Sequence, residues 1–159
     1  MRYIVLVVLL AILLAACDAR RVYEYNQDFK NRTWNVSDTA SFEFTIKDLG
    51  KKYNLYYNVR NSLDYPYARL FVQYSLQDST GSELRKELVS AFLFDQKTGK
   101  PQGSSGLGDV FDHQFPLLKD YEFKVPGKYK MKMEQFMRMD TLRGVLALGL
   151  RVEAAEEKK

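Results

Sequence analysis

Residues 128–138 read KYKMKMEQFMR, so apolar and charged side chains alternate through most of the segment. A period of two is typical of a β-strand that has one face in the core and the other in water. The same period recurs at residues 42–46, 54–60, 70–76 and 145–152. Strands at such short intervals predict an all-β protein.

The turns between these strands carry signals of their own. Asp78-Ser79-Thr80-Gly81 has the residues of a type I turn with a final glycine at positive φ, which predicts a hairpin. Residues 83–94 fit helical spacing as well as strand spacing, and their position between two hairpin-like turns favours a strand. No segment shows the alternation of strands and long helices that a parallel sheet requires. The sequence therefore predicts an antiparallel β-sandwich, immunoglobulin-like or jelly-roll-like.

The N-terminus has the layout of a bacterial lipoprotein signal. Arg2 precedes the apolar run Ile4–Leu14, which is too short for a stable span, because a helix needs roughly 20 residues to cross the hydrocarbon core. Leu14-Ala15-Ala16-Cys17 then resembles the lipobox, in which small residues precede a cysteine that receives diacylglycerol. We expect cleavage before Cys17 and acylation of its sulfur, which would hold the protein on a membrane.

These signals divide the chain into three parts. We expect a lipoprotein signal peptide at 1–16, a single lipid-anchored β-sandwich domain at 17–153 and a charged, disordered tail at 154–159. The segment after Cys17 contains no low-complexity linker, so the domain should start close to the membrane. Asp18 retains some lipoproteins of Gram-negative bacteria at the inner membrane, a rule that does not hold in all groups. We expect the cell envelope, and within it the outer membrane.

Composition excludes several classes of function. The chain carries 24 Lys and Arg against 20 Asp and Glu, and the two signs alternate along the sequence. A nucleic-acid-binding protein usually concentrates its Lys and Arg residues on one element, so nucleic acid is not an expected partner. One cysteine and one histidine exclude a disulfide within the chain and a zinc cluster of several ligands. We therefore expect a protein that is not an enzyme and that has no cofactor, no metal and no small-molecule substrate.

One segment could still carry chemistry. Residues 106–113 read GLGDVFDH and hold two carboxylates, Asp109 and Asp112, beside the single imidazole of His113. Such a loop could bind a cation weakly or present a general base, as in an envelope hydrolase. The two aspartates lack EF-hand spacing, and a lone histidine is a poor site for a transition metal. We expect a structural loop held by side-chain hydrogen bonds to the backbone.

A second candidate is a band of aromatic residues. Tyr56, Tyr65, Tyr67 and Phe71 lie within a short stretch, and the strand alternation points Tyr56 and Phe71 away from the core. Exposed aromatics on a sheet favour a protein interface or stacking on sugars. The alternative is that a second sheet or a loop covers this face.

Several stretches together resemble a known family. Residues 53–61 (YNLYYNVRN), 65–72 (YPYARLFV), 106–117 (GLGDVFDHQFPL) and 134–138 (EQFMR), together with the lipobox, are similar to the gliding-motility lipoprotein GldH family. The resemblance extends from residue 1 to about Glu153. It implies an outer-envelope lipoprotein needed for movement over surfaces and tied to the adhesin-exporting secretion machinery. It implies no known enzymatic activity, and Cys17 is the one functional position that maps by motif.

The expected function is therefore that of a non-catalytic accessory or binding component of the gliding and adhesin-secretion machinery. Its expected partners are the membrane, through acylated Cys17, and other gliding-motility or secretion proteins. The alternative is a glycan-binding surface lipoprotein, which the aromatic band and the sandwich shape would suit.

Overall fold

The structure is a computed structural model that describes residues 18, 20–106 and 108–156. The expected signal peptide and Cys17 lie outside the described residues. The elements follow one another as β1 (Arg21–Asp28), η1 (Lys30–Arg32), β2 (Thr33–Asn35), β3 (Ala40–Ile46), β4 (Tyr53–Ser62), β5 (Arg69–Gln77), β6 (Glu83–Phe92), β7 (Ser104–Ser105), β8 (Val110–Tyr121), β9 (Gly127–Gln135), β10 (Thr141–Arg143) and β11 (Val145–Ala154). No helix among the described residues has the length and apolar character needed to cross a membrane.

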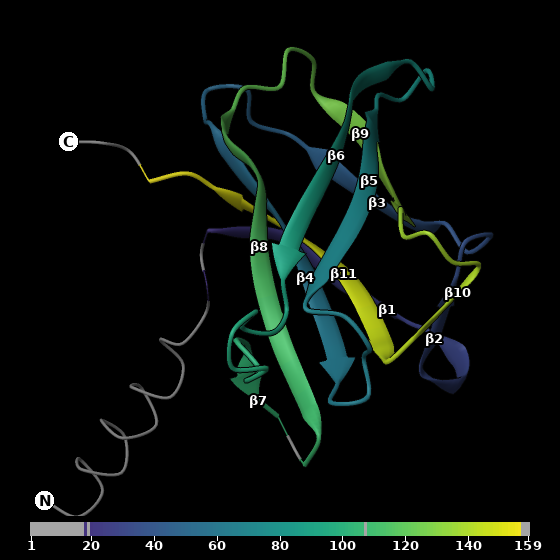
Figure 1. Cartoon of the computed structure of the whole chain (residues 1–159). Coiled ribbons are helices and arrows are strands. Elements are labelled where there is room, and N and C mark those ends of the chain that lie inside the picture. The colour runs from purple at the N-terminus through teal and green to yellow at the C-terminus, as the bar shows by residue number, and fades with distance from the viewer. Residues whose placement is uncertain (1–17, 19, 107, 157–159) are drawn as a thin grey trace, which may run out of the picture.

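The strands form two large antiparallel sheets. One has the order β1-β11-β4-β8-β7 and the other has the order β3-β9-β5-β6, while β2 and β10 pair separately. Figure 1 shows β5 and β6 in front of β4 and β11, so the two sheets form the layers of a sandwich. The predicted antiparallel β-sandwich is confirmed.

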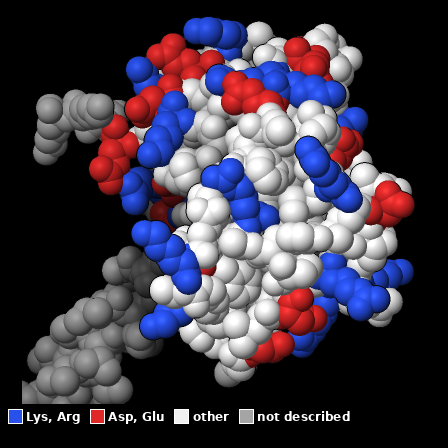
Figure 2. Space-filling view, viewed as in Figure 1, with Lys and Arg blue, Asp and Glu red and all other residues white. Residues whose placement is uncertain are grey.

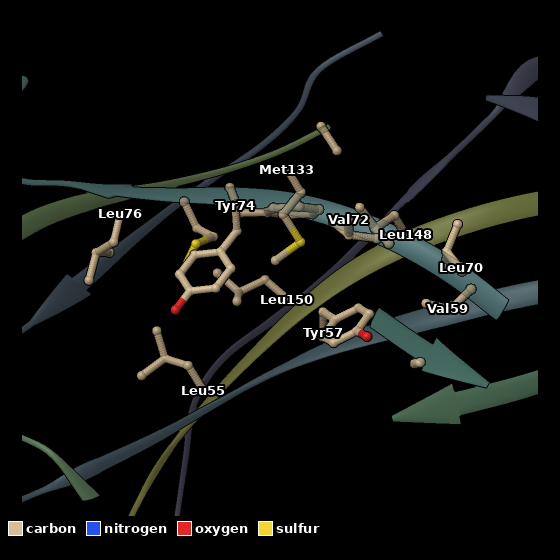
Figure 3. Close-up of a cluster of buried hydrophobic side chains, with 14 of the residues drawn as sticks. Leu55, Tyr57, Val59, Leu70, Val72, Tyr74, Leu76, Met133, Leu148 and Leu150 are labelled. Carbon is tan, nitrogen blue, oxygen red and sulfur yellow. The ribbon is translucent and has the colours of Figure 1, made fainter. Parts of the chain in front are cut away.

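Alternation along the strands explains the core. The inward side chains of β4 and β11 meet those of β5 and β9 between the two sheets, as Figure 3 shows. The residues labelled there are Leu55, Tyr57, Val59, Leu70, Val72, Tyr74, Leu76, Met133, Leu148 and Leu150. All of them are buried, and they are the residues that the period of two assigns to the inner face.

The hairpin predicted at Asp78–Gly81 joins β5 to β6. Gly81 has a φ of +84°, and Asp78 Oδ1 accepts hydrogen bonds from the amide groups of Thr80 (2.9 Å) and Ser82 (3.1 Å). The ambiguous segment 83–94 is a strand over Glu83–Phe92, as its position between two turns favours. It forms the edge of its sheet, and most of its residues are exposed, which explains why its sequence shows no clear buried face.

Two strands differ from the expectation. β8 covers part of the segment expected as a loop, and Asp112 and His113 lie on this strand, paired with Arg60 and Val59 of β4. Pro116 and the adjacent glycine-rich stretch hide the strand pattern in the sequence. Ala154, expected as the start of the tail, is the last residue of β11.

Two buried tyrosines give a test of this core. The Tyr57 hydroxyl has no hydrogen-bond partner within the described part of the chain, whereas the Tyr65 hydroxyl donates to the Arg69 carbonyl at 3.0 Å. Tyr57→Phe removes an unpaired polar group, so the free energy of unfolding should be unchanged or higher, whereas Tyr65→Phe should lower it by about 1 kcal/mol. Urea unfolding of both variants measures this difference. A larger loss for Tyr57→Phe would contradict the described packing.

Candidate functional site

The carboxylates and the histidine of residues 106–113 do not converge. Asp109 accepts a hydrogen bond from Arg32 Nη1 at 3.0 Å, and Asp112 accepts one from Arg60 Nε at 2.7 Å. Successive side chains on a strand point to opposite faces, so His113 points inward while Asp112 points outward. Among the described residues, no group of three or more His, Cys, Asp or Glu side chains could hold a metal ion.

His113 has the surroundings of a structural residue. It is 8% exposed, its Nε2 lies 2.9 Å from the Asn61 amide oxygen, and its ring stacks on Phe115 with a centroid distance of 5.5 Å. Gly103 packs so closely that a Cβ there would lie 2.7 Å from Nε2. Burial lowers the pKa of His113, and the nearby Asp112 opposes this to a smaller extent. The imidazole is therefore neutral and enclosed by its neighbours.

The pKa shift of His113 predicts a pH effect on stability. As pH falls below about 6.5, the unfolded chain binds a proton that the buried imidazole resists, so the free energy of unfolding falls until the lowered pKa is reached. His113→Gln lacks this contribution. Urea unfolding at about pH 7.5 and about pH 5.5 should show a smaller pH-dependent loss for the variant than for the wild type. Equal losses would show that His113 does not contribute.

The four aromatic candidates do not form one surface. Tyr65 is buried at 4% exposure, and its ring lies parallel to that of Phe94, so it belongs to the core and offers no surface to a partner. Tyr67 is 39% exposed and packs edge-on against Tyr65. Tyr56 lies on the outer face of the five-stranded sheet, while Phe71 lies on the outer face of the four-stranded sheet.

Phe71 belongs to an apolar cluster on its sheet, which we call the β5–β6 surface. Four of its members point outward from the adjacent strands β5 and β6, and the fifth follows the end of β9 beside Phe71; they are Arg69, Phe71, Leu88, Phe92 and Phe136. The Arg69 guanidinium carbon lies 4.1 Å from the centroid of the Phe92 ring and 5.6 Å from that of Phe71. The Phe71 carbonyl accepts a hydrogen bond from the Phe136 amide at 2.9 Å. The strand pairing therefore fixes these side chains beside one another.

The composition of the β5–β6 surface suits protein binding. Aromatic residues and arginine are enriched among the residues that dominate binding energy at interfaces. Leu88 and Phe136 are 48% and 55% exposed, so their apolar area is available to a partner. Figure 2 shows uncharged areas in the middle of the view, interrupted by a Lys or Arg side chain, while most charged side chains lie toward the rim.

Sequence reasoning found only one member of this surface. Phe71 was a candidate, whereas Arg69 and Phe92 were missed, although the predicted hairpin turn lies midway between them. Pairing outward from that turn brings Arg69 opposite Phe92. The missing information was the register of β5 against β6, which a single strand pattern does not contain.

The outer face of the five-stranded sheet has a different character. Asn26, Gly149, Asn58 and Gln114 form one cross-strand row over β1, β11, β4 and β8. Gln114 Nε2 donates to Asn58 Oδ1 at 3.1 Å, and a Cβ at position 149 would lie 1.8 Å from Asn26 Oδ1. The three carboxamide residues of the row line a polar hollow of about 280 Å³. Tyr56 lies on the same face, two residues from Asn58.

Comparison with known protein families shows which family the chain belongs to. A family model described as GldH lipoprotein matches residues 21–152. The chain belongs to the GldH lipoprotein family. The matched residues include nearly all of both large sheets, from the first residue of β1 to within two residues of the end of β11.

Two relatives are similar to this chain over almost their full length. The gliding motility lipoprotein GldH of Flavobacterium johnsoniae is 27% identical over 158 residues, which cover 93% of this chain and 94% of that protein. The GldH homolog of Christiangramia forsetii is 29% identical over 155 residues, which cover 91% of each chain.

Similar solved structures include parts of larger proteins. A family GH115 4-O-methyl-α-glucuronidase is similar with a TM-score of 0.48 at 12% identity, over 88% of this chain and 18% of that enzyme. The infectious bursal disease virus Gx strain structure is similar with a TM-score of 0.46 at 13% identity, over 86% of this chain and 32% of the viral chain.

Proposed function

We propose that this GldH-family protein is a lipid-anchored, non-catalytic binding component of the gliding-motility machinery and of the adhesin secretion tied to it, located at the outer membrane. The observation that carries the proposal is the family match over residues 21–152, which begins four residues after the lipobox cysteine. The relatives' names supply the connection to gliding motility.

The β5–β6 surface supports a binding role. Arg69 is held against two phenylalanine rings, so little side-chain freedom remains to be lost when a partner binds. β6 also leaves one side of its backbone unpaired at the edge of the sheet. Its inward-pointing Arg85 and Glu87 form an ion pair at 2.6 Å, and charges at such an edge disfavour pairing with another strand. The outward-facing side chains are thus the part of β6 that suits a partner.

A surface substitution tests this role. Leu88→Asp places a charge in the β5–β6 surface at an exposed position, so the domain should stay folded while partner binding weakens by about 2 kcal/mol, or roughly thirtyfold. Colony spreading and surface display of adhesins should fall toward the levels of a gene deletion. Leu63→Asp is the matched control, because Leu63 is 53% exposed outside this surface.

A gene-deletion strain distinguishes the motility assignment from the choice of the β5–β6 surface as the binding face. Normal spreading and normal adhesin export in that strain would contradict the motility assignment. Loss in the deletion strain with full activity of Leu88→Asp, at normal protein abundance, would instead exclude the β5–β6 surface as the binding face.

The polar hollow favours glycan binding as the second candidate function. Its carboxamides offer both donors and acceptors, which suit sugar hydroxyl groups, and Tyr56 lies on the same face for stacking. A glycan-binding protein would show a measurable affinity for oligosaccharides that Asn58→Ala removes, together with intact spreading of the deletion strain. The two candidate functions therefore predict opposite motility results.

A further inference from the structure

We infer that one end of the sandwich rests on the membrane, with Leu49 at the lipid interface and the ammonium group of Lys47 beside the phosphates of the lipid headgroups. The inference rests on the proposed acylation of Cys17. It adds an orientation and a contact surface that acylation alone does not provide.

Few residues separate the expected anchor from the first strand. Asp18 follows Cys17 directly, and consecutive Cα atoms lie about 3.8 Å apart. The Arg21 amide donates to the Asp18 carbonyl at 3.1 Å, and β1 begins at Arg21. The acyl chains are therefore attached within a few residues of a strand that is already paired.

A charged network fixes Asp18 in place. The Arg151 side chain, only 16% exposed, donates to the carboxylate of Asp18 and also to Glu24 Oε2 and Glu153 Oε2, each at 2.9 Å. The hydrogen bond from Arg151 lowers the pKa of Asp18, so this carboxylate stays charged at neutral pH. The residue next to the anchor is thus joined to β11, which pairs with both β1 and β4.

The residues around this attachment point form one end of the molecule. The Ala154 amide donates to the Arg20 carbonyl at 2.8 Å, and the Ala155 amide donates to the Lys52 carbonyl at 2.8 Å. A groove of about 570 Å³ lies between the start of β1 and the loop that joins β3 to β4. It combines apolar walls from Val22, Phe44 and Tyr53 with basic Arg20, Lys47 and Lys51.

The loop beside the groove has the chemistry of a membrane contact. Leu49 is 44% exposed, and a rigid turn holds the loop, because Asp48 Oδ1 accepts from the Gly50 amide at 2.8 Å and the Tyr53 hydroxyl donates to the Asp48 carbonyl at 2.6 Å. Lysines near a membrane surface keep their stems over apolar area and their ammonium groups among the phosphates. Leu49, two residues from Lys47 and two from Lys51 in sequence, matches this arrangement.

The acidic groups at this end do not cancel the attraction. Asp48 pairs with Lys51 at 3.3 Å, Glu122 pairs with Lys52 at 3.3 Å, and Glu43 pairs with Lys130 at 2.8 Å. Arg20 likewise pairs with Glu156. Within the described part of the chain, no carboxylate lies at ion-pair distance from Lys47. Because each of these acids is already neutralised, Lys47 remains available to a headgroup phosphate.

The opposite end of β4 provides a matched control position. β4 runs for 10 residues from Tyr53, next to the Leu49 loop, to Ser62, which at about 3.3 Å per residue spans about 30 Å. Leu63 follows β4 and is 53% exposed, close to the exposure of Leu49. A protein held by the proposed end keeps Leu63 away from the bilayer.

The test uses the full, acylated protein reconstituted into liposomes of phosphatidylethanolamine and phosphatidylglycerol with brominated acyl chains. A tryptophan is introduced by Leu49→Trp or Leu63→Trp, and wild-type emission from the fully buried Trp34 is subtracted. We expect brominated lipid to quench the added emission by about half at position 49 and to leave position 63 unchanged, since interfacial groups lie about 5–10 Å into the bilayer boundary.

Two further measurements keep the outcomes distinct. In the acylated protein without the tryptophan substitutions, amide hydrogen exchange at residues 47–52 should slow on liposomes, while that at 63–68 should not change. Labelled palmitate should enter the wild type and not Cys17→Ala. Equal quenching at positions 49 and 63 in labelled protein would overturn the proposed orientation and leave the anchor intact. Absence of label would overturn the proposed acylation together with the orientation.

Discussion

The pairing of the first strand with the last is the constraint on which the rest of the structure depends. β1 runs antiparallel to β11 from Arg21 opposite Glu153 to Asp28 opposite Ala147, and β11 pairs in turn with β4. The inward side chains of β11 enter the core, while Arg151 on its outer face binds Asp18 and Glu24. The pairing of β1 with β11 therefore also fixes the residue next to the proposed lipid anchor.

The strands that could be predicted from a period of two are those with one buried face, whereas β6 could be predicted only from the turns that flank it. β3, β4, β5, β9 and β11 keep a period of two because each packs one side against the opposite sheet. β1 and β8 escaped prediction for different physical reasons. β1 lies at a sheet edge and is exposed over most of its length, and β8 contains Pro116 and follows a glycine-rich stretch.

The candidate sites were less predictable, because they depend on register and on which side of the chain is covered. Asp112 and His113 are neighbours in sequence, yet β8 sends their side chains to opposite faces. The burial of Tyr65 depends on Phe94, which is distant in the sequence and whose ring lies parallel to the Tyr65 ring. The Arg69–Phe92 pair likewise exists only because the hairpin aligns β5 with β6.

The two proposals place different tasks on different parts of one small sandwich. The end near Asp18 suits a membrane, whereas the outward side chains of β5 and β6 suit a protein partner. Site-specific photo-crosslinking in intact cells tests the binding role most directly, with the crosslinker placed at Leu88 or, as a control, at Leu63. The account predicts a covalent adduct with a second motility or secretion protein from position 88 only. Equal adducts from both positions, or none from position 88 in spreading cells, would contradict it.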